Sequence, residues 1–462
     1  MNTNLPKVIF QARKYTLLFL ISIISSITTV NYYALNNNTS ETILDNGLKV
    51  IVKQDHRAPV IISQIWYRVG SSYESNGITG ISHMLEHMMF KASQNLKDGE
   101  FTEIIARNGG DQNAMTSNDF TAYYQMLSRD KLETSFRLES ERMKNLLLDP
   151  VVFDKEREVV IEERRMRTDD DPISNTYERL LAVAHLDSPY HHPVIGWPDD
   201  LKNYRIEDLK LWYDKWYSPN NAIIVVVGDV EPENVFTLAK KYFGGIRKGQ
   251  IADPKASSEA KPMGLRTLNV QLPAKQPYLF LAYNVPSFKT AINKKDAYAL
   301  DVISYILSNG NSSRLSKKLE REQELVAQVG SSYDGFNLYN SLFLLTAMPA
   351  QGKTINQVEN ALQKELELLK RELVKPEELT RVKTNIIANK VYEQDSIYFQ
   401  ALLIGMLESV NLGWQTYDEY LINLQAITPA DIQEAAQKYF VNDRLTITKL
   451  EPIPIGEQKN TE

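Results

Sequence analysis

One short segment organises the whole chain: Ile81-Ser82-His83-Met84-Leu85-Glu86-His87-Met88-Met89-Phe90. Its two histidines stand four residues apart, so on a helix they share one face and lie one turn from each other. Two neutral imidazoles can bind one Zn²⁺ ion at about 2.0–2.1 Å and leave the metal open for a third ligand and a water molecule. Glu86 would project beside that water and could take its proton. The order His-x-x-Glu-His is the inverse of the commoner zincin motif.

The surroundings of this motif favour a metal site over a pair of core or surface histidines. The chain has only 6 His, and two of them fall in the motif. Glu86 stands within an apolar run from Met84 to Phe90, where an unpaired carboxylate would be costly. Both observations indicate that the segment has a chemical role.

Length and composition describe an ordinary globular protein. With 462 residues the chain is too long for one core and suits two to four domains. The net charge of -6, without any run of basic residues, argues against nucleic acid as the main partner. The chain contains no cysteine, which excludes disulfides, thiolate catalysis and zinc sites built on Cys.

Residues 1–36 have the pattern of a segment that directs export. Three basic residues, Lys7, Arg13 and Lys14, precede an apolar run from Tyr15 to Ile24. This order is typical of a secretory signal peptide. The possible cleavage sites are poor, so an uncleaved membrane anchor is the alternative. In both cases we expect the rest of the chain to be periplasmic or otherwise in the cell envelope.

The remainder predicts two similar α+β domains. We expect a catalytic first domain over residues 41–247, a polar linker over 248–266 and a second domain over 267–455. Residues 206–227 can be laid on 429–450 without a gap, and both copies indicate a helix, a short turn and a buried strand. Such a repeat indicates a duplicated unit. The duplication is asymmetric in its chemistry, because all 6 His lie in the first domain.

A charged helix expected over residues 154–167 offers a third metal ligand. Glu156 and Glu163 are seven residues apart, which is two helical turns, and therefore share one face. Glu162 is the competing candidate. Spacing alone does not decide among these three glutamates.

Together these features resemble the M16 metallopeptidase family, which includes pitrilysin, insulin-degrading enzyme and the β-subunit of the mitochondrial processing peptidase. The resemblance rests on His83–His87 and on the acidic helix from Glu156 to Glu163, and it covers roughly residues 41–450. Further matches are Asn113-Ala114-Met115-Thr116-Ser117, His192-Pro193-Val194-Ile195-Gly196 and Tyr217-Ser218-Pro219-Asn220-Asn221. At this length the chain resembles the short, two-domain bacterial members, whose domains are each a mostly antiparallel sheet packed with helices.

The resemblance implies a role for each polar residue of the site. His83, His87 and Glu163 would bind one Zn²⁺ ion, because the family's third ligand falls on Glu163. Glu86 would be the catalytic base, and Glu156 would be the second, assisting catalytic glutamate.

The resemblance also implies where a peptide substrate binds. The matching segment is the edge strand on which these enzymes hold an extended peptide through its free N–H and C=O groups. In this chain the strand carries the following residues: Asn113, Ala114, Met115 and Thr116.

The second half departs from the family pattern. Active single-chain members carry an Arg and a Tyr seven residues apart, which help to bind the substrate. Here Glu320 and Ala327 stand at those positions. This difference implies a heterodimer or homodimer with an M16 homologue that carries the Arg/Tyr pair.

The sequence therefore predicts a zinc-dependent endopeptidase that hydrolyses peptides or unfolded polypeptides, with one Zn²⁺ ion per chain. The main alternative is a non-catalytic peptide-binding or scaffold subunit of an M16-type complex. A further alternative is a metal-dependent hydrolase of non-peptide substrates. Metal content distinguishes the scaffold from the enzymes, and peptide against ester turnover distinguishes the two enzymes.

Overall fold

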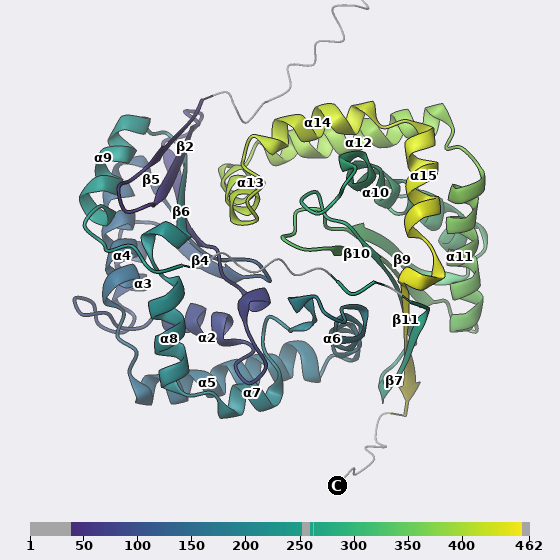
Figure 1. Cartoon of the computed structure of the whole chain (residues 1–462), viewed down its shortest axis with the longest axis horizontal. Coiled ribbons are helices and arrows are strands. Elements are labelled where there is room, and N and C mark those ends of the chain that lie inside the picture. Colours follow the sequence, from purple (N-terminus) through teal and green to yellow (C-terminus); the bar gives the residue numbers. More distant parts are fainter. Residues whose placement is uncertain (1–37, 252–258, 262, 455–462) are drawn as a thin grey trace, which may run out of the picture.

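The computed structural model describes residues 38–251, 259–261 and 263–454, and it has two lobes that each contain one sheet (Figure 1). The signal peptide or anchor expected over residues 1–36 lies outside these ranges, as does part of the expected linker. Among the helices that the structure describes, none combines the length and the apolar character that a membrane crossing requires.

The first lobe is built on a six-stranded sheet with the order β1-β2-β6-β3-β5-β4. Only β2 and β6 run parallel, and every other neighbouring pair is antiparallel. The Asn46-Gly47 turn joins the first hairpin, with Gly47 at φ 88°. The strands are β1 (Thr39–Ile43), β2 (Lys49–Gln54), β3 (Val60–Tyr67), β4 (Asp111–Thr116), β5 (Thr121–Ser128) and β6 (Ala222–Gly228).

The second lobe repeats this topology. Its five-stranded sheet has the order β7-β11-β8-β10-β9, which matches β2-β6-β3-β5-β4 of the first sheet, and again only one pair, β7 and β11, is parallel. The strands are β7 (Arg266–Pro273), β8 (Tyr278–Val285), β9 (Val326–Tyr333), β10 (Ser341–Pro349) and β11 (Leu445–Ile453). The expected fold of two homologous α+β domains with mostly antiparallel sheets is confirmed.

The internal repeat predicted from the sequence is also present in the structure, where the two copies align element by element. Helix α8 (Ile206–Trp216) and helix α15 (Pro429–Tyr439) have equivalent first and last positions. The strands that follow, β6 and β11, occupy equivalent positions in the two sheets. Strand β7 begins at Arg266, the last residue of the linker predicted over residues 248–266, and Arg266 pairs with Thr446.

Helices cover both sheets. In the first half they are α2 (Ile81–Met88), α3 (Glu100–Arg107), α4 (Leu132–Asn145), α5 (Pro150–Arg164), α6 (Pro172–Ala184), α7 (Pro198–Asn203), α8 and α9 (Pro232–Phe243). In the second half they are α10 (Lys294–Leu307), α11 (Ile355–Arg371), α12 (Pro376–Glu393), α13 (Ile397–Ser409), α14 (Thr416–Ala426) and α15.

One helix from each half packs against the sheet of the other half. Leu180 and Ala184 of α6, from the first half, share an apolar cluster with Phe280 of β8 and Leu450 of β11 in the second half. In return, Ile404 and its neighbours on α13 join a core that includes strands β3 and β6. Figure 1 shows α6 beside the second sheet and α13 beside the first. This exchange holds the two lobes together and leaves a chamber between them.

Candidate metal centre

The motif helix α2 is held in place at its first turn. Its apolar side, which includes Met84 and Leu85, is fully buried in the core of the first lobe, so the opposite side with the two histidines faces away from that core. The carboxylate of Glu74 accepts hydrogen bonds from the backbone N–H groups of Gly80 at 2.6 Å and Ser82 at 2.9 Å. Two otherwise unsatisfied donors at the helix N-terminus are thereby paired.

Three side chains converge beside α2. The Nε2 atoms of His83 and His87 lie 3.6 Å and 3.3 Å from Oε2 of Glu163. Two atoms that each lie about 2.0–2.1 Å from a tetrahedral zinc ion are about 3.3–3.4 Å apart. Oε2 of Glu163 is buried and has no hydrogen-bond partner in the described part of the chain. One histidine pair and one carboxylate therefore fit a single zinc ion.

The two histidines differ in their protonation. Burial and the neighbouring His87 lower the pKa of His83 to about 4, so His83 is neutral at neutral pH. Burial also lowers the pKa of His87, but the hydrogen bond to Glu156 and the nearby carboxylate of Glu163 outweigh it and raise that pKa to about 9. A metal ion would take the place of the proton on His87, because only the neutral imidazole is a ligand.

The structure distinguishes the three glutamates that the sequence left as alternatives. Glu163 joins the two histidines. Glu156 lies behind His87, where it contacts Nδ1 at 2.9 Å and also pairs with Lys91 at 2.7 Å. Glu162 is exposed and pairs with Arg165 at 2.6 Å. The roles inferred for Glu163 and Glu156 remain predictions, but their positions agree with those roles.

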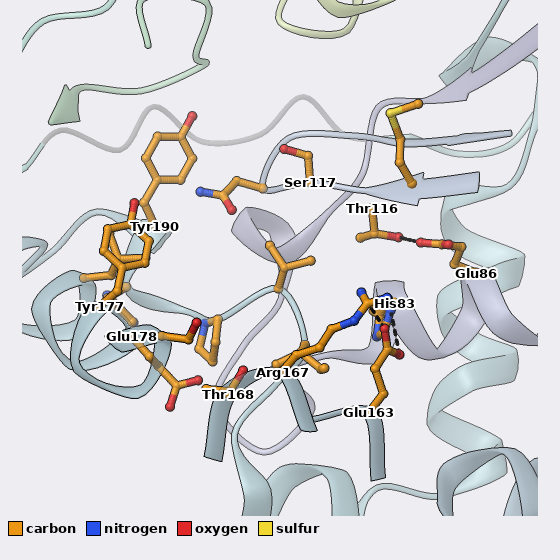
Figure 2. A pocket seen from close by; sticks show the side chains of 18 of the residues that line it. His83, Glu86, Thr116, Ser117, Glu163, Arg167, Thr168, Tyr177, Glu178 and Tyr190 are labelled. Carbon is orange, nitrogen blue, oxygen red and sulfur yellow. Dashed lines mark hydrogen bonds and ion pairs between the residues drawn. The ribbon is translucent and has the colours of Figure 1, made fainter. Parts of the chain in front are cut away.

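Arg167 is a site residue that the sequence analysis missed. It lies in a π-helical turn, Arg165–Asp169, that directly follows α5. Its Nη1 atom lies 2.7 Å from Oε1 of Glu163, and Figure 2 shows the guanidinium directed toward Glu163 and His83. One oxygen of Glu163 is therefore occupied by Arg167 and the other is free for a metal. The i,i+4 spacing of the two residues was the available signal.

Glu86 lies on the same helix, one residue before His87, and lines the chamber. Its Oε2 atom accepts a hydrogen bond of 2.5 Å from Oγ1 of Thr116, the last residue of β4 (Figure 2). Burial raises the pKa of Glu86, and the bond from Thr116 acts in the opposite direction. The sequence analysis placed Thr116 on the substrate strand but did not foresee this contact.

The chamber has a volume of about 1560 Å³ and is lined by both halves of the chain. The predicted substrate residues, which are Asn113, Ala114, Met115 and Thr116, all lie on its wall. Their strand, β4, is the last of its sheet and pairs only with β5 within the described residues. Tyr333 and Asn337 contribute to the wall from the second half. Glu320 and Ala327 are exposed and do not line the chamber.

Comparison with known proteins agrees with this geometry. Residues 49–196 match the family described as insulinase (peptidase family M16), and residues 203–386 match the peptidase M16 inactive domain. The zinc protease PqqE of Helicobacter pylori is 37% identical over 423 residues, which are 88% of this chain and 92% of that protein. The chain belongs to peptidase family M16. The suspected resemblance is confirmed, and an M16 relative named as a zinc protease is consistent with a zinc site.

Solved structures show the same M16 fold. A protease from Helicobacter pylori has a TM-score of 0.85 at 35% identity, with 90% of this chain and 99% of that chain covered. The periplasmic protease PqqL of Escherichia coli has a TM-score of 0.76 at 20% identity. The match covers 91% of this chain but 48% of PqqL, so this chain is similar to about half of that longer protein.

Proposed function

We propose that this M16 protein is a zinc-dependent endopeptidase that hydrolyses peptides or unfolded polypeptides. The observation that carries the proposal is the convergence of His83, His87 and Glu163 next to Glu86, at the wall of a chamber bordered by an open strand edge. His83, His87 and Glu163 would hold the ion. A bound zinc ion supplies a Lewis acid, which acidifies water toward a pKa of about 7 and polarises a carbonyl oxygen.

The protein's own residues carry the remaining chemistry. Glu86 takes a proton from the attacking water and passes it to the leaving amine. Glu156 accepts a hydrogen bond from Nδ1 of His87, which keeps the Nε2 lone pair directed at the metal site. An extended peptide adds to the free edge of β4 through its backbone groups.

We also propose that the chain acts as the metal-bearing subunit of a homodimer or heterodimer with an M16 homologue. The support is that Glu320 and Ala327, at the positions of the expected Arg/Tyr pair, lie outside the chamber. In a heterodimer, the homologous partner would supply that pair. The pattern of residues 1–36 supports export to the periplasm or another part of the cell envelope.

The test combines metal analysis with peptide cleavage. The purified protein is assayed for zinc content and for cleavage of quenched peptides, alone and mixed with a candidate homologue that carries the Arg/Tyr pair. We expect one zinc ion per chain and cleavage that rises strongly in the mixture. Full cleavage by the monomer would contradict the dimer, and absence of metal would favour the scaffold.

The Glu86→Gln variant tests the assignment of the base. It keeps the three metal ligands and removes the proton acceptor, so zinc content should be unchanged and turnover should fall by a factor of about 10²–10⁴. Unchanged turnover would exclude Glu86 as the base.

A further inference from the structure

The contact between Thr116 and Glu86 joins the substrate strand to the proposed base. A carboxylate can only accept, so the hydroxyl of Thr116 donates to Oε2 of Glu86, at 2.5 Å. The other oxygen, Oε1, receives no hydrogen bond from the residues that the structure describes. Since Glu86 lines the chamber, one of its two oxygens is held and the other remains available there.

One short segment holds both partners of this contact. In residues 70–74, the backbone N–H of Ser72 donates to the carbonyl of Asn118, just beyond the end of β4, at 2.8 Å. Two residues later, the carboxylate of Glu74 accepts hydrogen bonds from the backbone N–H groups of Gly80 and Ser82 at the start of α2. The end of the strand and the start of the helix are thus fixed to the same five residues.

The packing at the start of this segment is equally tight. A Cβ atom at Gly70 would lie 2.1 Å from the carbonyl oxygen of Ser117, a separation that real Cβ atoms essentially never show. The segment and the strand end are therefore in direct backbone contact at Gly70, with no room for a side chain between them. A fixed frame of this kind is what holds a reacting side chain in one geometry.

We propose that Thr116 is a positioning residue for Glu86. Its hydroxyl donates a hydrogen bond to Oε2 and so leaves Oε1 as the single oxygen that can accept a proton from the attacking water. This inference rests on the proposed function. Thr116 then has two functions. Its backbone forms part of the substrate strand, and its side chain positions the carboxylate of Glu86. A peptide that pairs with β4 therefore touches the residue that aligns the proton acceptor.

The test compares Thr116→Val with Thr116→Ser. Valine has nearly the same shape but no hydroxyl, so kcat should fall about 10- to 100-fold while KM changes little. Serine keeps the donor and should restore most of kcat. Zinc content should be equal in all variants, because none of them alters a ligand.

Thr102→Val is the matched control. The hydroxyl of Thr102 accepts a hydrogen bond of 2.7 Å from the side chain of Gln112, at the opposite end of β4. This variant loses a threonine hydroxyl beside the same strand, but not the one that touches Glu86. Its kcat should equal that of the wild type.

Three results would overturn the inference. A rise in KM at constant kcat in Thr116→Val would make Thr116 a substrate contact only. Equal losses in Thr116→Val and Thr116→Ser would show that the hydroxyl is not the cause. Additive shifts of the unfolding temperature for Thr116→Val and Glu86→Ala in the double variant would show that the two side chains do not interact.

The unfolding measurement also separates this inference from the proposed function. Non-additive shifts would support the Thr116–Glu86 contact even if the protein cleaved no peptide. Absence of cleavage in the wild type, by contrast, would count against the endopeptidase and leave the measured coupling between the two side chains in place.

Discussion

The Nδ1 atom of His87 lies 2.9 Å from Oε1 of Glu156, on the side of the imidazole opposite Glu163. The second carboxylate oxygen of Glu156 is paired with Lys91 at 2.7 Å. Hydrogen bonding to His87, with further help from Lys91, lowers the pKa of Glu156 and keeps it ionised. An ionised acceptor on Nδ1 fixes the tautomer of a ligating histidine and strengthens Nε2 as a ligand.

This relationship predicts that Glu156→Gln weakens zinc binding without removing a ligand. The dissociation constant for zinc, measured by competition with a chelator, should rise about 10- to 100-fold. Glu158→Gln is the control, because Glu158 is an exposed glutamate on the same helix. Equal zinc affinities of the two variants would contradict a role of Glu156 behind His87.

The assignment of Glu163 as the third ligand predicts that substitutions at Glu163 and at its neighbour Glu162 have different effects on zinc binding. Glu163→Gln removes the ionised oxygen that faces both histidines and should abolish stoichiometric zinc binding. Glu162→Gln breaks only an exposed pair with Arg165 and should leave zinc content at one ion per chain. Metal analysis after dialysis measures both. Zinc retention by Glu163→Gln together with loss in Glu162→Gln would reverse the assignment.

The burial of the Glu74 carboxyl group predicts that the stability of the protein depends on pH. Burial raises its pKa from 4.5 to about 7, although its bonds to Ser82 and Gly80 act against this. The folded protein therefore binds this proton more tightly than the unfolded chain does. The contribution of Glu74 to stability is greatest below pH 4.5 and is lost as the pH rises through 7, a change of roughly 3 kcal/mol.

The measurement is denaturant unfolding of the wild type and Glu74→Gln between pH 5 and pH 8. Glutamine does not titrate, so the free energy of unfolding of the wild type relative to the variant should decrease as the pH rises. Parallel pH curves would show that Glu74 does not titrate in this range. Comparison with the variant removes the contribution of all other groups.

The close packing of Gly405 on α13 against the first half predicts that a larger side chain at this position destabilises the protein. A Cβ atom at this position would lie 2.0 Å from Cε2 of the buried Trp66 on β3. Overpacking of this kind typically costs about 1–3 kcal/mol, which outweighs the roughly 1 kcal/mol that alanine gains over glycine in a helix. Gly405→Ala should therefore lower the free energy of unfolding.

Gly245→Ala is the control for this prediction, because a Cβ atom at Gly245 meets nothing within 4 Å. Its free energy of unfolding should stay within about 1 kcal/mol of the wild type. If Gly405→Ala were as stable as this control, α13 would be able to shift away from Trp66 at little cost.

Much of the fold could be predicted from local sequence patterns. The helix and strand at residues 206–227 and 429–450 were correctly assigned because an amphipathic helix, a short turn and an apolar strand are each defined by adjacent residues. The convergence of Glu163 on the motif followed from the family resemblance. Spacing alone could not separate it from Glu162, since one residue along a helix turns a side chain by about 100°.

The contacts between distant segments could not be predicted in this way. The apolar stripe of α6 shows that the helix is buried, but it does not show that the sheet of the other half covers it. The bond from Thr116 to Glu86 depends on how a strand end meets a helix 30 residues earlier. Helix α5 also began earlier than expected, at Pro150, because Asp149 caps its first turn.

The exchange of α6 and α13 has a consequence for how the two repeats fold. A solitary copy of the repeat would leave the apolar face of its sheet without the helix that covers it here, and its own donated helix without a sheet. Two copies that donate helices to each other satisfy both needs at once. Each repeat therefore depends on the other for the burial of its apolar surface, and the two halves form one cooperative folding unit rather than two independent domains.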